Sequence, residues 1–105
     1  SSTISSDAKL KTNIEDINYG LADVIKLQGR RFDWIREDRG NDIGLIAQEV
    51  QEVIPEVVKE VDGLNGRDPY LTVDYAKLTS VLIEAVKELK EEIDDIRKKC
   101  DCLND

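Results

Sequence analysis

The amino-acid sequence predicts an α+β fold: a small globular part of short strands and helices, followed by a long C-terminal helix that assembles as a coiled coil. Two observations carry this prediction. Between residues 31 and 73, short apolar runs alternate with turn residues, a pattern typical of strands and one short helix. From Asp74 onward, neither Gly nor Pro interrupts the chain, and apolar residues follow a seven-residue repeat.

Length and composition limit the possible functions. A chain of 105 residues with 40% hydrophobic residues forms one domain with a modest core. Its 15 basic and 23 acidic residues give a net charge of −8, which argues against a nucleic-acid partner. No apolar run approaches the roughly 20 residues that a membrane span needs. Histidine is absent, and two cysteines alone cannot complete a tetrahedral zinc site. We therefore expect no metal and no cofactor.

The N-terminal quarter begins with a small, polar segment at residues 1–6, which resembles a flexible junction. Apolar residues at positions 14, 17, 21, 24 and 25 then have a helical period and predict a helix over residues 14–25. Gly20 weakens this prediction, because a glycine inside a helix costs about 1 kcal/mol relative to alanine. Gln28 and Gly29 end the segment.

The middle of the chain predicts four short strands and one helix. In order, we expect a strand at 31–35, a polar turn at 36–42, a short buried strand at 43–46, a helix at 47–54 that Pro55 ends, a strand at 57–61, a turn at 62–66 and a strand at 70–73.

The C-terminal helix carries an assembly pattern, with Asp74 as its expected N-cap. Its apolar residues are spaced alternately by four and three, which a straight helix of 3.6 residues per turn would not keep on one face. The predicted a and d positions of the heptads are Val86, Leu89, Ile93, Ile96, Cys100 and Leu103. Glu92 then lies at g and Arg97 at the next e, where they could pair between parallel helices.

The heptads leave three alternatives open. Val or Ile at a with mostly Leu at d favours a dimer, whereas Ile at both Ile93 and Ile96 favours a trimer. The stretch from Leu78 to Val86 could instead pack on its own domain, as an ordinary amphipathic helix does. Cys100 and Cys102 could form an interchain disulfide ring, but in a reducing compartment we expect Cys100 to fill the seam as a small apolar residue.

The first residues contain a candidate serine nucleophile, Ser6. Without histidine the serine–histidine route is closed, and a lysine can act as the base only where burial removes its proton near neutral pH. Lys11 is five residues from Ser6, so the two side chains can meet only across a turn or between subunits. Lys9, three residues from Ser6, is the local competitor. From spacing alone this pairing is a weak signal, because the chain is rich in lysine.

The sequence motifs around Ser6 and in the middle of the chain strengthen the case for a Ser6–Lys11 pair. Ser6-Asp7 followed by Leu10-Lys11 and Asn13-Ile14 resembles the start of the intramolecular chaperone auto-processing domains of phage endosialidases, tail spikes, tail fibres and neck appendages, which also occur in myelin regulatory factor. Phe32-Asp33-Trp34 is similar to the aromatic strand of that family. The run from Ile43 to Val58, with Gly44-Leu45-Ile46-Ala47-Gln48-Glu49-Val50, follows its central motif. The resemblance covers roughly residues 6–90.

The resemblance implies a homotrimer with a parallel trimeric coiled coil, which promotes trimerisation of the upstream protein and then cuts itself away. It implies Ser6 as nucleophile, Lys11 as general base and Ser5–Ser6 as the scissile bond. Asp7 would fix the turn, and Asn13 or Gln48 would donate hydrogen bonds to the oxyanion. The implied partners are other copies of the chain and the upstream fibre or tail-spike domain. The implied location is the host cytoplasm during virion assembly, with release from the mature virion protein after cleavage.

On this interpretation residues 1–5 are an upstream linker, 6–74 the globular auto-processing domain and 75–105 the coiled-coil helix. One departure is that family members often carry a histidine just before the Ile43 motif, where this chain has Arg39 to Asp42 without one. Two alternatives keep the family but change the role: a permanent, uncut trimerisation cap of a fibre protein, or the auto-processing domain of a membrane-tethered transcription factor. A dimeric coiled-coil adaptor is the remaining alternative.

Overall fold

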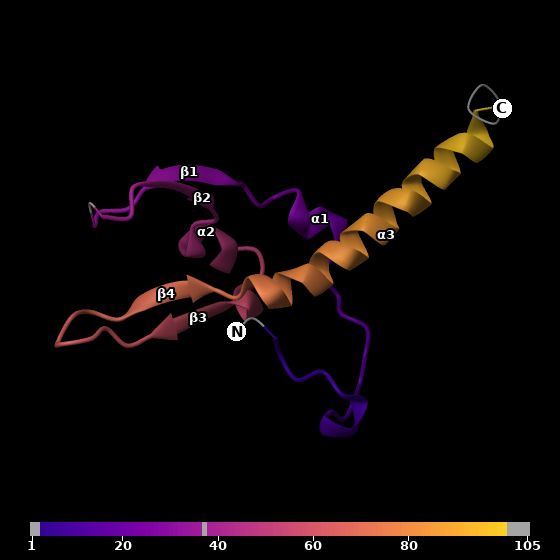
Figure 1. The fold of residues 1–105 in the computed structure, drawn as a ribbon. Helices are drawn as coiled ribbons and strands as arrows, with labels where there is room; N and C mark the ends of the chain where they lie inside the picture. Colours follow the sequence, from indigo (N-terminus) through magenta and orange to yellow (C-terminus); the bar gives the residue numbers. More distant parts are fainter. Residues whose placement is uncertain (1–2, 37, 101–105) are drawn as a thin grey trace.

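The computed structural model describes residues 3–36 and 38–100 and has an α+β architecture, as the sequence predicts. Two antiparallel hairpins and two short helices gather around the first half of one long helix, α3 (Tyr75–Lys99). The second half of α3 projects away from this body, and the N-terminal segment extends from it in another direction (Figure 1). The molecule is therefore elongated, 63 Å along its longest axis.

The first hairpin pairs β1 (Arg30–Asp33) with β2 (Asn41–Gly44). The sequence placed the second of these strands at residues 43–46, within an apolar run, and this position is wrong. The Asn41 side chain explains the shift, because its Nδ2 donates to the Phe32 carbonyl oxygen at 3.0 Å and to Asp33 Oδ1 at 2.8 Å. These bonds extend the pairing into the polar residues that were expected to form the turn.

The second hairpin pairs β3 (Val58–Val61) with β4 (Tyr70–Val73). The predicted strand at 70–73 is confirmed residue for residue, and the strand predicted at 57–61 begins one residue later. Asn65 and Gly66 have positive φ angles in the connecting turn, a conformation that Asn and Gly adopt most readily.

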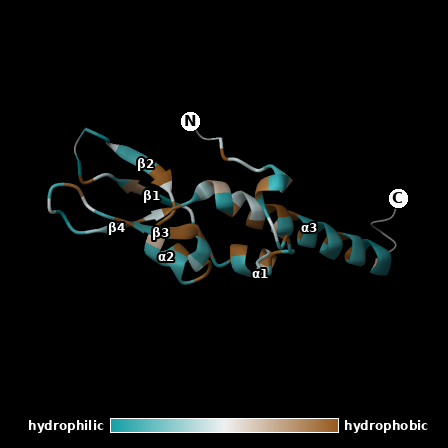
Figure 2. Cartoon of the chain, turned by 90° about the horizontal axis from the view of Figure 1, so that it is seen from below, coloured by the Kyte–Doolittle hydropathy of each residue, from teal (hydrophilic) through white to brown (hydrophobic). Residues whose placement is uncertain are grey.

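Between the hairpins lies α2 (Ala47–Gln51), followed by the single turn η2 (Pro55–Val57). The helix ends before Ile54 because the residue before a proline avoids the helical conformation, and Ile54 has φ −134°. Val50 and Ile54 of the predicted helical face are nevertheless almost fully buried. They form the core with Val57, Leu78 and Val81. Figure 2 shows hydrophobic residues gathered where α2, β3 and the start of α3 meet.

The helix predicted over residues 14–25 is mostly wrong. Only α1 (Leu21–Val24) is helical, and Gly20 is its N-cap rather than an interior residue. Residues 3–18 are exposed and contain one short turn, η1 (Ala8–Leu10). We call residues 3–18 the arm. Ile14 was expected to lie on the apolar face of this helix, but its side chain remains 73% exposed.

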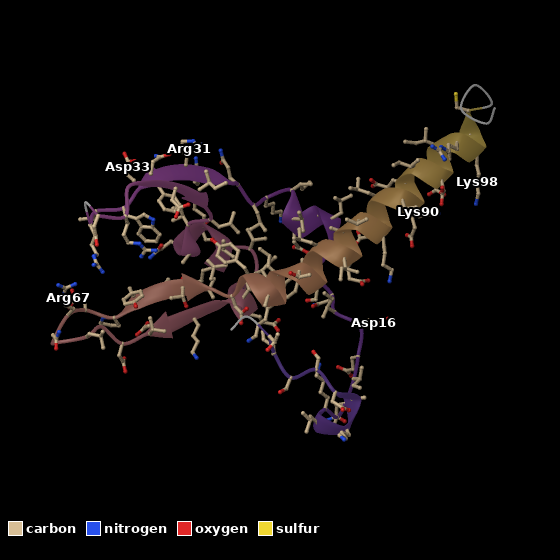
Figure 3. All side chains as sticks on the ribbon, in the orientation of Figure 1. Asp16, Arg31, Asp33, Arg67, Lys90 and Lys98 are labelled. Atoms are coloured by element: carbon tan, nitrogen blue, oxygen red, sulfur yellow. The ribbon has the colours of Figure 1, made fainter. Side chains whose placement is uncertain are left out.

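The long helix begins as predicted, because the Asp74 side chain accepts a hydrogen bond from the Lys77 backbone N–H at 3.1 Å. Leu78, Val81 and Ala85 are buried against the body. Beyond Ala85 the helix has no buried residue among those described, and the labelled Lys90 and Lys98 side chains extend from it into solvent (Figure 3). The first half of α3 thus packs on its own domain.

Candidate functional site

Ser6 and Lys11 meet across the turn η1. Asp7 is the N-cap of this turn, and the Leu10 and Lys11 N–H groups donate to the carbonyl oxygens of Asp7 and Ala8 at 3.0 and 3.1 Å. The chain thereby reverses between residues 6 and 11. As a result, Lys11 Nζ donates to Ser6 Oγ at 3.2 Å. Of the two ways in which the sequence allows these side chains to meet, the single chain uses the turn.

Lys9, the local competitor, is directed elsewhere. Its backbone N–H donates to Asp7 Oδ1 at 3.0 Å, and its Nζ lies 3.9 Å from Asp7 Oδ2. Asp7 thus holds the turn through its side chain and keeps the Lys9 ammonium on its own carboxylate. Lys11 is the lysine that contacts Ser6 in the structure.

Both side chains of the Ser6–Lys11 pair are exposed in the single chain. In this contact the lysine amine is the donor and the serine oxygen is the acceptor. A general base must instead accept the serine proton, which requires that the amine lose its hydration. The turn therefore brings a serine and a lysine side chain together at an exposed place on the chain.

The two supporting residues named from the sequence lie in different places. Asn13 follows Lys11 by two residues and has a left-handed backbone conformation, φ 52°, which turns the arm after the pair. Gln48 lies on α2, on the other side of α3 from η1 (Figure 1). One chain alone does not bring Gln48 to Ser6.

The arm joins the body at Tyr19 and Gly20, which the sequence did not single out. Tyr19 OH donates to Glu56 Oε1 at 3.0 Å, and its ring packs against the core. This hydrogen bond, with burial and the Glu56 charge, raises the pKa of the Tyr19 hydroxyl. The two residues are 37 positions apart, so no local pattern could have indicated the contact.

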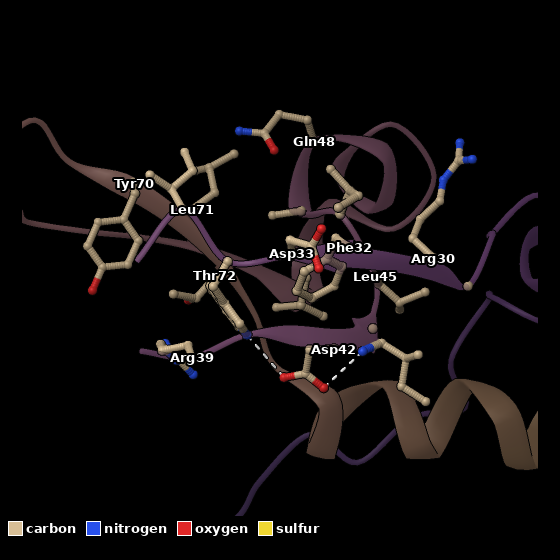
Figure 4. A pocket seen from close by; sticks show the side chains of 18 of the residues that line it. Arg30, Phe32, Asp33, Arg39, Asp42, Leu45, Gln48, Tyr70, Leu71 and Thr72 are labelled. Atoms are coloured by element: carbon tan, nitrogen blue, oxygen red, sulfur yellow. Dashed lines mark hydrogen bonds between the residues drawn. The ribbon is translucent and has the colours of Figure 1, made fainter. Parts of the chain in front are cut away.

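A groove of about 1310 Å³ separates the two hairpins. Figure 4 shows its polar centre, where Asp42 accepts hydrogen bonds from Trp34 Nε1 at 3.1 Å and from the Ile43 N–H at 2.8 Å. These bonds lower the pKa of the Asp42 carboxyl, with the Trp34 bond as the largest cause. The Arg39 guanidinium stacks over the Trp34 ring at 3.8 Å. Gln48 also lines this groove.

The predicted heptad positions form an exposed apolar stripe on α3. The exposed fractions are 64% for Val86, 43% for Leu89, 46% for Ile93 and 53% for Ile96. We call these four residues the seam. Leu103, the last predicted heptad position, lies outside the described residues.

Cys100 ends α3 and is half-buried. It is disulfide-bonded in this structure. The expectation that Cys100 fills the seam between associated helices as a small apolar residue stays a prediction. Cys102, the other cysteine considered for an interchain ring, lies outside the described residues.

Within residues 3–36 and 38–100, no group of three or more His, Cys, Asp or Glu side chains is arranged to hold a metal ion. Across the same residues no helix combines the length and apolar character needed to cross a membrane.

Comparison with known proteins adds independent evidence. Residues 6–59 match the model of a family that is named as a peptidase and described as "chaperone of endosialidase". The long tail fiber protein Gp37 of Enterobacteria phage K3 is 35% identical over 100 residues, and the aligned part covers 91% of this chain and 8% of that protein. Gp37 of Enterobacteria phage M1 is 32% identical over 100 residues, covering 90% of this chain and 39% of the relative.

The chain thus spans less than half of each of these relatives. The family match covers just over half of the chain, and it includes the Ser6–Lys11 turn, β1, β2 and α2. It starts at Ser6, the residue that contacts Lys11. This chain belongs to the chaperone of endosialidase family.

Proposed function

We propose that this domain is an intramolecular chaperone that drives homotrimerisation of an upstream tail-fibre region and then releases itself by cutting the Ser5–Ser6 bond. The observation that carries the proposal is the 3.2 Å contact between Lys11 Nζ and Ser6 Oγ. The family match and the similarity to tail fiber proteins support the chaperone role. In this proposal the reaction takes place in the host cytoplasm during virion assembly.

The chemistry follows from the position of Ser6 directly after the scissile carbonyl. Neutral Lys11 accepts the Ser6 hydroxyl proton as Oγ attacks the Ser5 carbonyl carbon. The C–N bond breaks, the proton passes from Lys11 to the Ser6 nitrogen, and Ser5 is left as an ester on Oγ. Water then hydrolyses the ester, which gives a Ser5 carboxylate and a free Ser6 amine and hydroxyl. Asn13, or Gln48 from a neighbouring subunit, would donate to the oxyanion.

In this proposal, association of the chains turns the cleavage reaction on. The lysine amine is exposed in one chain, so the reaction stays off until neighbouring copies remove its water. The seam provides the association surface, because four large apolar residues on one helix face remain exposed. Glu92 and Arg97 would pair between parallel helices. Release after one reaction would make the fold of the upstream fibre kinetically locked.

The test uses a precursor that carries upstream fibre sequence, incubated at neutral pH and analysed by intact mass. We expect cleavage between Ser5 and Ser6 in the wild type and none in Ser6→Ala or Lys11→Ala. Lys9→Ala is the matched control, since Lys9 lies on the same turn and pairs with Asp7 instead of Ser6. Cleavage of the Ser6→Ala or Lys11→Ala precursors at the wild-type rate would contradict the proposal.

One observation favours a second candidate, a permanent trimerisation cap that is never cut. The Ser6–Lys11 contact is formed in the single chain but is exposed, and one chain does not by itself remove the water around the lysine amine. A precursor that reaches trimeric mass and remains intact would support the cap. A precursor that reaches trimeric mass and is then cut supports self-release.

A further inference from the structure

We propose that Tyr19, through its hydrogen bond to Glu56, is a positioning residue for self-cleavage. It fixes the arm to the body, so that the Ser6–Lys11 turn has a defined place relative to α3. This inference rests on the proposed self-cleavage, and it adds a determinant that lies outside the reacting pair.

The burial pattern locates the attachment point. Every described residue of the arm is exposed, and η1 contains no buried residue. Among the described residues, Tyr19 is the first half-buried one along the chain and Gly20 the first buried one. The direction in which the arm leaves the body is therefore set at these two residues.

Tyr19 contacts a rigid part of the body. Its acceptor, Glu56, lies in η2 between Pro55, which has a fixed φ, and Val57, which is 3% exposed. Beside this contact is a small cleft of about 240 Å³, whose lining includes Ile17, Tyr19 and Lys77. An anchor of this kind transmits the orientation of the core to the C-terminal end of the arm.

Gly20, the residue after Tyr19, lies close to a side chain of the long helix α3. A Cβ at Gly20 would overlap the Glu88 carboxylate, so the end of this α3 side chain reaches the Gly20 backbone. The Gly20 N–H donates to Asp23 Oδ2 at 3.0 Å, which starts α1 against α3. The chain that directly follows the arm thus packs on the helix that also carries the seam, since α1 contacts α3.

This arrangement connects assembly to the reacting pair. When the seams of several chains associate, each α3 takes a fixed position, and the anchored arm must follow it. Without the Tyr19–Glu56 bond the trimer would still form through the seam, but the arm would sample more orientations. The Ser6–Lys11 turn would then occupy its desolvated place for a smaller fraction of the time.

The experiment measures precursor cleavage together with trimer mass and melting temperature. Tyr19→Phe keeps the ring and removes the hydroxyl, and we expect cleavage about fivefold slower, the effect of losing one average hydrogen bond. Glu56→Ala should slow cleavage equally. Glu56→Gln, which keeps an acceptor oxygen, should restore the rate to within about twofold of wild type. Tyr70→Phe on β4 is the control, because Tyr70 is 58% exposed on the second hairpin.

The double variant Tyr19→Phe with Glu56→Ala separates a specific contact from general damage. If the two residues act as one bond, the double variant cleaves no more slowly than either single variant. Wild-type rates in both single variants, additive losses in the double variant, or slow cleavage explained by loss of the trimer would each overturn the inference. A Ser6→Ala precursor in the same series tests self-cleavage itself: if that precursor is cut, the proposed function fails instead.

Discussion

The seam residue Ile93 offers a direct test of the proposed coupling between assembly and cleavage. Ile93 lies in the projecting half of α3, beyond the last residue of the helix that is buried against the body, and is 46% exposed. Replacing it with alanine removes apolar surface without touching the body of the domain or the Ser6–Lys11 turn. Any effect on cleavage must therefore pass through association.

The size of the effect follows from the exposed fraction. Fully burying an isoleucine side chain stabilises by about 1.5–3 kcal/mol, so burying the remaining exposed half contributes about 1 kcal/mol. The proposed trimer contains three copies, so the loss sums to about 3 kcal/mol. Because each 1.4 kcal/mol is a factor of ten, the association constant of the trimer should fall about 100-fold.

Sedimentation equilibrium over a range of concentrations measures this change, with cleavage followed in the same samples. At concentrations where the wild type is trimeric and the Ile93→Ala chain is not, cleavage should slow in proportion to the lost trimer. Glu91→Ala is the matched control, because Glu91 lies at the f position, opposite the seam. An unchanged association constant would refute the assignment of the seam. Wild-type cleavage by dissociated Ile93→Ala chains would refute the coupling.

Three further predictions concern stability. Because hydrogen bonding lowers the Asp42 pKa, its contribution is present above the ordinary carboxyl range and is lost as the pH falls through the folded-state value, below about pH 4. Fluorescence of Trp34, the one tryptophan of the chain, should report this loosening of the first hairpin, and Asp42→Ala should abolish the acid step. Ile54→Ala empties a site with 0% exposure and should cost about 2–5 kcal/mol in urea unfolding. Asp74→Ala removes the cap of α3 and should cost about 1 kcal/mol, with Ser80→Ala on the exposed face of α3 as the comparison.

The parts of the fold that sequence patterns predicted well are those in which local chemistry and tertiary packing agree. The strand at 70–73 has apolar β-formers between turn residues, and the start of α3 has a capping Asp before a long run without Gly or Pro. Pro55 ended α2 as expected, although the helix stops three residues sooner because Ile54 adopts a non-helical conformation before the proline.

The predicted helix at 14–25 is mostly wrong because contacts with distant residues fix the chain at Tyr19 and Gly20, in the middle of the predicted element. Tyr19 bonds to Glu56 and Gly20 packs on Glu88, two partners far along the chain that no local pattern specifies. The left-handed Asn13 also directs the backbone away from a continuous helix. The second strand moved for a similar reason, since the Asn41 side chain bonds across the hairpin to Phe32 and Asp33.

By itself, the sequence determined the α+β class, the long capped helix with its seam, and the identity of a serine and a lysine five residues apart. These features depend on local propensity, periodicity and residue chemistry, which can be read from the order of the residues. The folded structure decided that the turn at Asp7 brings Lys11 rather than Lys9 to Ser6, that this pair stays exposed in one chain, and that Tyr19 bonds to Glu56. The turn is held by local hydrogen bonds whose geometry the residue order alone does not specify, and the Tyr19 bond joins residues 37 positions apart, which only folding brings together.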